Sequence, residues 1–248
     1  MQFLIFICCL MMRVLVASAC PPIETLPWTN GSDDEAMYYA APFLPQNPII
    51  LEAGVCDGED SIRFKTLWPK STIYGFEAHP EHFARATEAF KKLTGAFLYH
   101  EALFDRVGTI TFNCSTLASG CSSVLTDNKG NIDNIFNDPP ELCSYKDVPI
   151  TVNCTTIDHW AKREDVIKID YIWLDTEGAE LTILQNAKSI LPTVKVISTE
   201  VSFQEFRKGM TRFSELYDFL TENGFVLQSI WGNPRWQAVG LFVKKNSE

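Results

Sequence analysis

Positive charge is scarce in this chain of 248 residues. Lysine and arginine together number 21 against 31 aspartates and glutamates, so the formal net charge is −10 at pH 7 and the isoelectric point is near 4.9. Binding to nucleic acid or to an anionic membrane surface needs clustered Lys and Arg to neutralise phosphates. The composition therefore argues against a nucleic-acid partner and favours a neutral or cationic ligand.

Two short motifs are also absent. No G-x-G-x-x-G occurs after any expected strand, which disfavours the pyrophosphate grip of a dinucleotide and, with it, a nicotinamide-dependent oxidoreductase. None of the eight cysteines has the C-x-x-C spacing of a zinc site. No repeat or low-complexity block is present, so the chain has the composition of an ordinary globular domain.

Long apolar runs are confined to the N-terminal segment. The run from Phe3 to Met12 is interrupted by Arg13, and small residues at 17–19 precede Cys20, as at a secretory cleavage site. The run is shorter than the roughly 18 residues of a spanning helix. We expect residues 1–20 to be a signal or anchor segment. The chain would then be exported or membrane-associated through it, and cytoplasmic if the segment is not a signal.

The remaining residues predict one α/β domain. Residues 21–47 read as a surface lead-in with at most a short helix near Ala36 to Ala41. From residue 48 to 248, short β-branched runs alternate with helical periods, which predicts a mostly parallel sheet closed by an antiparallel hairpin. The expected strands are 49–53, 72–77, 97–100, 109–114, 148–155, 171–175, 194–201, 225–231 and 237–243, and the expected helices are 59–67, 81–93, 179–190 and 213–222.

A polar, turn-rich insertion at about 115–147 interrupts this alternation and is too long for a plain connector. Because cysteines bracket and occupy it and the leader points to export, we hypothesise two nested disulfides, Cys114–Cys154 and Cys121–Cys143. We expect substrate contacts in this insertion and in the hairpin from Trp231 to Trp236.

The strongest local motif is IILEAGVCDGEDS, in which a buried strand runs into a helix through a glycine turn. Gly54 and Gly58 let the backbone turn tightly and approach a ligand, and Ser61 can help to cap the helix. Glu52 at the strand end suits a cationic part of a ligand, such as an amino group or a sulfonium. A purely structural turn is the alternative for this motif.

A second acid, Glu77, ends the next strand in IYGFEAHP. A carboxylate there is placed to accept hydrogen bonds from both ribose hydroxyls of an adenosine group, whereas the alternative is a solvated acid at a strand end. Open α/β sheets bind ligands at the C-terminal ends of their strands, so Glu52, Glu77 and the glycine turn together favour a ligand site.

Three further acids cluster in WLDTEGAEL, at another junction of strand and helix. Glu177 and Glu180 could simply complement the helix dipole in its first turn. Alternatively, Asp175 faces the ligand crevice as a base or a metal ligand, and Glu200 points to the same edge. Neighbouring carboxylates repel one another, which raises at least one pKa unless a cation balances them.

In order and spacing, five motifs resemble the FkbM-type S-adenosylmethionine-dependent methyltransferases over about residues 48–244: LEAGVCDGEDS, YGFEAHP, HEALFDRVG, LDTEGAELTIL and FLTENGFVLQSIWG. The resemblance implies a class I methyltransferase (Rossmann-like) fold, with a seven-stranded sheet whose last strand is reversed. It also implies S-adenosylmethionine as cofactor and O-methylation of a hydroxyl on a sugar, glycan or natural product.

The resemblance also assigns cofactor contacts by position. The methionine end would lie against Glu52, Gly54 and Gly58, with Ser61 counted among the binding residues. Glu77 would hold the ribose, and Glu101-Ala102 would lie beside the adenine.

The transfer itself requires a base for the acceptor hydroxyl. Asp175, Glu177 and His79 are the candidates, although His79 beside Pro80 equally fits a helix-entry residue. A divalent cation on Asp175 and its neighbours is a second possibility, because hard oxygen ligands suit Mg²⁺; no residue is assigned as a metal ligand. The alternative function is a non-catalytic, exported binding module that keeps the fold.

Overall fold

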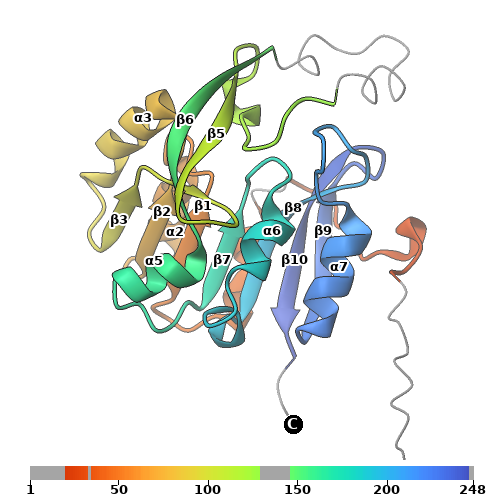
Figure 1. Cartoon of the computed structure of the whole chain (residues 1–248). Helices are drawn as coiled ribbons and strands as arrows, with labels where there is room; N and C mark the ends of the chain where they lie inside the picture. Colours follow the sequence, from red (N-terminus) through yellow and green to blue (C-terminus); the bar gives the residue numbers. More distant parts are fainter. Residues whose placement is uncertain (1–19, 33–34, 129–145, 246–248) are drawn as a thin grey trace, which may run out of the picture.

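The computed structural model describes residues 20–32, 35–128 and 146–245. The predicted leader and half of the predicted insertion lie outside these residues. The described part is built on a seven-stranded sheet in the order β3-β2-β1-β7-β8-β10-β9 (Figure 1). Its neighbouring strands are parallel except at β10, which is antiparallel to both β8 and β9. The strands are β1 (Ile49–Ala53), β2 (Thr72–Phe76), β3 (Ala96–Tyr99), β7 (Tyr171–Leu174), β8 (Val196–Ser202), β9 (Phe225–Gly232) and β10 (Gln237–Lys244).

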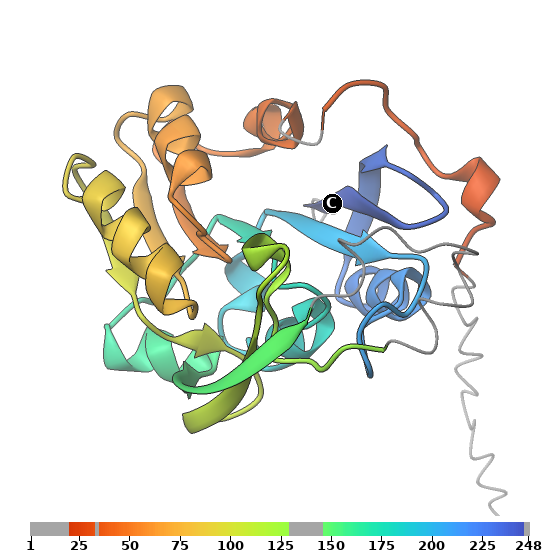
Figure 2. The same cartoon turned by 90° about the horizontal axis from the view of Figure 1, so that it is seen from above.

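This arrangement confirms the predicted fold class. Helices cover both faces of the sheet (Figure 2). Because each central strand is buried on both sides, successive residues point into different cores: Ile50 packs with one layer of helices and Leu51 with the other. One layer is α1 (Ala36–Ala40), α2 (Glu59–Leu67) and α3 (Pro80–Phe90), and the other is α5 (Ile157–Arg163), α6 (Glu180–Gln185) and α7 (Phe213–Glu222).

Helices α2 and α7 have the predicted bounds, and α3 ends three residues earlier than predicted. The other two helices of the main sheet's second layer differ more. α5 was not predicted; Thr156 caps it by accepting a hydrogen bond from the backbone N–H of His159 at 3.1 Å. α6 ends earlier than predicted. The Asn186 side chain donates to the carbonyl of Thr182 at 2.8 Å, and such side-chain bonds to the backbone compete with helix continuation.

The lead-in is more than a surface segment. It contains the predicted short helix as α1, and Met37 and Ala40 of that helix are fully buried against the sheet. Upstream, Trp28 forms a bridge with Ile230 of β9, so the lead-in also covers an edge strand. Among the described residues, no helix combines the length and the apolar character needed to cross a bilayer.

A hairpin of β5 (Gly108–Ser115) and β6 (Asp147–Thr155), with the short strand β4 (Ala102–Leu103), forms a second sheet that rises above the C-terminal ends of the main strands (Figure 1). Its register contradicts the predicted Cys114–Cys154 disulfide. Cys114 lies opposite Val148, six positions from Cys154, and both thiols are free. Six residues of strand span about 20 Å, far beyond disulfide reach. The second predicted pair includes Cys143, which lies outside the described residues.

Candidate active site

A cavity opens at the C-terminal ends of β1, β2 and β7, under the β5–β6 hairpin. The space within it, counted together with the part that is open to solvent, is about 720 Å³. Residues from the hairpin and from the start of the insertion, including Phe112, Ser119 and Ser122, complete its wall. Of the predicted site residues, those that line the cavity are Gly54, Glu77, His79, Glu101, Ala102 and Asp175.

The turn between β1 and α2 brings β1 against β7. Gly54 has a φ of +87°, and a Cβ at this position would lie 1.8 Å from the carbonyl oxygen of Asp175. Only glycine fits so close a backbone contact. Gly58, with a φ of +90°, is the N-cap residue of α2 and does not line the cavity.

Glu52 and Ser61 lie beneath this turn and do not line the cavity. Both are fully buried, and the Ser61 hydroxyl donates to a Glu52 carboxylate oxygen. The expected cap role of Ser61 is therefore wrong: α2 has no side-chain cap, because the hydroxyl is engaged by Glu52. Burial raises the pKa of Glu52 well above its ordinary value, with Asp60, Glu77 and Asp175 adding to the effect.

Glu77 is held at the cavity wall by backbone donors. One carboxylate oxygen accepts from the N–H of Cys56 and the other from the N–H of His79, each at 2.7 Å. Burial raises the pKa of Glu77 to about 7, although these hydrogen bonds oppose the rise. Each carboxylate oxygen has a further lone pair, so both can still accept from a ligand.

Two histidines and a serine lie at the far end of the cavity. His79 is the N-cap of α3 and accepts a hydrogen bond from the backbone N–H of Glu81 at 3.3 Å. It therefore has the helix-entry role that was the alternative to a catalytic base. Its ring stacks on His82 at 4.3 Å, and a His82 ring nitrogen lies 2.9 Å from the Ser119 hydroxyl. Burial lowers the pKa of both histidines, that of His82 to about 4. Both rings are therefore neutral at pH 7.

Glu101 and Ala102 also line the cavity. The carboxylate of Glu101 is already bound by the guanidinium of Arg163, through two bonds of 2.8 and 2.7 Å. Bidentate pairs of this kind fix the side chains that form them. Glu101 is therefore fixed in the cavity wall, and the positive charge of Arg163 balances its negative charge.

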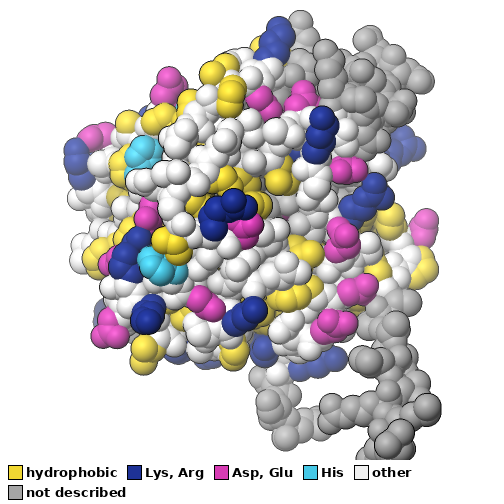
Figure 3. All heavy atoms as spheres, viewed as in Figure 1, with side chains coloured by type: hydrophobic (Ala, Val, Ile, Leu, Met, Phe, Trp, Pro, Cys, Tyr) yellow, Lys and Arg dark blue, Asp and Glu magenta, His cyan; other side chains and the backbone are white. Residues whose placement is uncertain are grey.

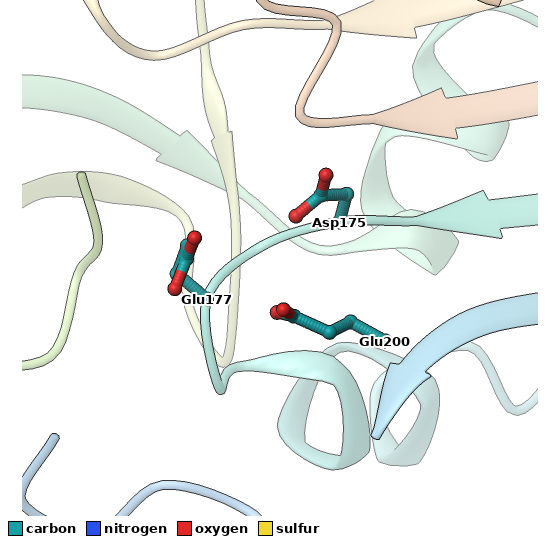
Figure 4. Close-up of side chains that lie close together, drawn as sticks. All are labelled: Asp175, Glu177 and Glu200. Atoms are coloured by element: carbon teal, nitrogen blue, oxygen red, sulfur yellow. The ribbon is translucent and has the colours of Figure 1, made fainter. Parts of the chain in front are cut away.

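Three carboxylates converge at the opposite end. The side chains of Asp175, Glu177 and Glu200 point toward one another (Figure 4), and their ligand oxygens lie within 4.8 Å of one another. Such a set can face a cationic ligand group or accept a hard divalent cation. Asp175 is the exposed member and lines the cavity, whereas Glu177 does not.

Glu177 is held in an unusual conformation. Its φ is +56°, a left-handed value that is uncommon outside glycine, and its carbonyl accepts from the Ser123 hydroxyl at 2.9 Å. Burial raises its pKa to about 7, and the positive charge of Arg207 opposes that rise. Glu180 has a local role instead, accepting from the N–H groups of Thr176 and Gly178, both at 3.1 Å.

A second, smaller cavity of about 500 Å³ meets the first at Asp175. Asp60 of α2 and Glu200 of β8 also line it, with Trp173 and the polar residues Ser198 and Thr199. Asp175 thus borders two spaces, one that Glu77 also lines and one that Asp60 and Glu200 also line.

Sequence reasoning missed His82, Ser119 and Arg207. His82 faces the cavity one turn after His79 on α3, a spacing that could have drawn attention to it. Arg207 is fully buried, yet it stands in a polar stretch with no periodic signal. Of the predicted hairpin contacts, Trp231 is fully buried in the core and cannot touch a substrate.

The reversed last strand and the cavity at the ends of β1, β2 and β7 define a protein of the methyltransferase fold. Residues 52–227 match the Methyltransferase FkbM domain. The chain is 32% identical over 186 residues to 2-O-methyltransferase NoeI of Sinorhizobium fredii (strain NBRC 101917 / NGR234), covering 73% of this chain and 74% of that protein. The chain belongs to the FkbM methyltransferase family and is a methyltransferase.

Solved structures show the same fold at low identity. The methyltransferase FkbM of Methylobacillus flagellatus KT has a TM-score of 0.50 and 12% identity, over 91% of this chain and 48% of that one. The present chain therefore spans about half of that protein. The fibrillarin/Nop5p complex also gives a TM-score of 0.50, with 14% identity over 86% of this chain and 81% of that one.

Proposed function

We propose that this protein transfers a methyl group from S-adenosylmethionine to a hydroxyl of a sugar, glycan or natural product. The observation that carries the proposal is the position of Glu77, at the end of β2 beside the glycine turn, on the wall of the cavity at the ends of the central strands. NoeI, by its name a 2-O-methyltransferase, supports oxygen as the acceptor atom.

The residues present fit this cofactor. The Glu77 carboxylate is fixed by two backbone donors and has lone pairs for the ribose hydroxyls. At the other end, Asp175 and the acids behind it suit a positively charged sulfur and amino group. When bound, the cofactor supplies an electrophilic methyl group. The protein's part is to hold the two reactants in line, which accounts for most of the rate in such displacements.

The second cavity is the natural place for the acceptor, because it meets the cofactor cavity at Asp175. Three carboxylates line it, from Asp60, Asp175 and Glu200. These acids favour an uncharged polyol or an amino-bearing acceptor and repel phosphorylated or carboxylated ones. The face seen in Figure 3 has basic and acidic side chains interspersed, without the basic stripe of a nucleic-acid binder.

Asp175 is the base that this arrangement favours, because it is the exposed member of the three acids and borders both cavities. Glu177 is already faced by the charge of Arg207. That positive charge also works against a divalent cation in the cluster, so we favour proton removal by a carboxylate over metal assistance.

The test has two parts. Calorimetric titration with S-adenosylmethionine, S-adenosylhomocysteine and NAD should show binding of both sulfur nucleotides and not of NAD. Mass spectrometry should then follow methylation in a panel of neutral, amino-bearing, phosphorylated and carboxylated methyl glycosides. We expect methylation of the neutral and amino-bearing glycosides only. Failure to bind either sulfur nucleotide would contradict the proposal, and binding without turnover would point to a binding module.

The location of the protein is a separate proposal, that residues 1–20 direct it to or across a membrane. Detection of the full-length protein in the soluble cytosolic fraction of its own cells, with an intact N-terminus by peptide mass, would contradict it.

A further inference from the structure

Arg207 is the one buried arginine or lysine among the described residues, and it lies on the loop between β8 and α7. Its exposed fraction is 0%. A buried guanidinium is tolerated only where hydrogen bonds and opposite charge replace its water. Its partners therefore indicate what it holds together.

Besides the charge of Glu177, Arg207 faces three hydrogen-bond partners in the β5–β6 hairpin and in the segment that follows β5. One terminal nitrogen donates to the carbonyl of Leu125 at 2.8 Å and to the carboxylate of Asp147 at 3.1 Å. The other donates to the carbonyl of Cys121. Arg207 thus joins chain segments that are 60 to 86 residues apart in the sequence.

Backbone hydrogen bonds extend this contact along residues 121–128, here termed the strap. The N–H of Lys208 donates to Thr126 at 2.8 Å, and the N–H of Asn128 donates to Phe206 at 3.0 Å. The strap therefore lies along the β8–α7 loop like a short added strand, with the guanidinium beneath it.

The strap is also a wall of the site. Ser122 and Val124 line the cofactor cavity, and the Ser123 hydroxyl donates to the carbonyl of Glu177 at 2.9 Å. From the other side, Thr211 donates to the carbonyl of Gly178 at 3.1 Å. The loop that bears the acid cluster is thus held between the strap and the segment that carries Arg207.

We propose that Arg207 is a positioning residue for the methyl transfer: it fastens the strap to the β8–α7 loop and so keeps the cavity wall and the Asp175–Gly178 loop in the cofactor-binding arrangement. This inference rests on the proposed function. It predicts that loss of Arg207 loosens the strap locally and weakens cofactor binding, while the central sheet stays folded.

The experiment compares Arg207→Met, Arg207→Lys and Asp147→Asn with Arg212→Met, which removes an exposed arginine from the same loop. Hydrogen exchange measured by mass spectrometry follows the strap and, as an internal reference, β1. Calorimetry measures the affinity for S-adenosylhomocysteine at a temperature where each variant is fully folded.

We expect strap exchange in Arg207→Met to be about tenfold faster with β1 unchanged, and S-adenosylhomocysteine to bind about tenfold more weakly. Lysine keeps the charge but not the forked geometry, so Arg207→Lys should recover only part of the loss. Arg212→Met should behave as wild type. A merely structural role would speed exchange in β1 as much as in the strap, which would overturn the inference.

Unchanged strap exchange, or a loosened strap with unchanged affinity, would also overturn it. If Arg207→Met does not fold, Asp147→Asn is the deciding variant. It should show faster strap exchange and weaker binding, both smaller than expected for Arg207→Met. An absence of both changes would overturn the inference. Failure of the wild-type protein to bind S-adenosylhomocysteine would instead contradict the proposed function.

Discussion

The two ends of the cavity are built differently. After the proposed function, we term the part of the cavity at Glu77 the nucleoside end and the part at Asp175 the transfer end. At the nucleoside end, Glu77 is held by the backbone N–H groups of Cys56 and His79, both in turns that follow strand ends. At the transfer end, Asp175, Glu177 and Glu200 come together with Arg207, and the strap from the β5–β6 region holds their loop. The first end depends on local backbone geometry, whereas the second depends on charges from distant segments.

The two ends should therefore differ in how well they tolerate mutations of nearby side chains. A carboxylate fixed by backbone donors keeps its place when other side chains are altered. A cluster balanced by one buried arginine does not, because removal of one partner leaves uncompensated charge. We therefore expect mutations at the nucleoside end to affect binding alone. At the transfer end, loss of Asp175 should affect mainly the rate, whereas loss of Arg207 should loosen the site and weaken binding as well.

The largest expected effect is at the point where the two ends meet. Gly54→Ala would place a Cβ 1.8 Å from the Asp175 carbonyl oxygen, so β1 and β7 would have to separate. We expect a loss of about 4 kcal/mol in the free energy of unfolding and loss of S-adenosylhomocysteine binding. Urea denaturation measures the first. Gly209→Ala is the matched control, since Gly209 has a φ of +75° and no atom within 4 Å of the added Cβ. Its cost should be about 1 kcal/mol.

The next effect isolates the transfer end. Asp175→Asn removes the proposed base and should lower kcat by about 10²–10⁴-fold. The affinity for S-adenosylhomocysteine should fall far less, because this molecule lacks the positive sulfur and its amino group still faces Glu177 and Glu200. Single-turnover methyl transfer to the best glycoside of the panel measures the rate. Asp105→Asn, at an exposed ion pair with Arg106, should leave both quantities unchanged. Equal losses in rate and affinity for Asp175→Asn would show that the residue binds cofactor instead.

Glu77→Ala tests the nucleoside end. Loss of one or two charge-assisted bonds from the ribose should weaken S-adenosylhomocysteine binding by about 1.5–3 kcal/mol each. The kcat at saturating cofactor should change little, because Asp175 and its neighbours are untouched. An unchanged affinity would refute the ribose assignment.

A smaller effect concerns pH. Because the pKa of Glu77 is raised to about 7, the free protein holds a proton there below that pH. Ribose hydroxyls donate to the ionised form, so binding below about pH 7 releases this proton. The affinity should therefore rise as the pH increases to about 7 and level off above it. Calorimetry between about pH 6 and about pH 8 should show a gain of at most tenfold per pH unit. Glu77→Gln should flatten this dependence, and if the slope persists another group is responsible.

The smallest effect is an expected null result. If a carboxylate removes the proton, treatment with EDTA should leave kcat unchanged, and added Mg²⁺ should not raise it. Loss of activity in EDTA, restored by Mg²⁺, would assign the three acids to a metal instead.

The sequence predicted the first end better than the second. β1 and α2 have the predicted bounds, and Glu77 lies at the cavity wall, because strand-to-helix turns leave local marks in glycines and terminal acids. Apolar runs likewise predicted where most strands of the main sheet lie along the chain, and that the last two strands form an antiparallel hairpin. These features depend on residues close together in the sequence.

The second end depends on contacts that no local pattern records. Nothing in the loop around Arg207 indicates a buried charge, and its partners lie in the insertion. The same limit explains the mistaken Cys114–Cys154 pair, which assumed that the ends of two strands were neighbours when the antiparallel register separates them. Ser61 was misjudged for a related reason, because its hydroxyl meets Glu52 across the turn and does not cap α2.

The central claim is that Glu77 holds the ribose of S-adenosylmethionine at the end of β2. A crystal structure of the protein with S-adenosylhomocysteine tests it most directly. We predict both ribose hydroxyls within about 3.2 Å of the Glu77 carboxylate oxygens, with the sulfur on the Asp175 side of the cavity. A nucleoside bound away from Glu77, or with its sulfur pointing away from Asp175, would contradict the account.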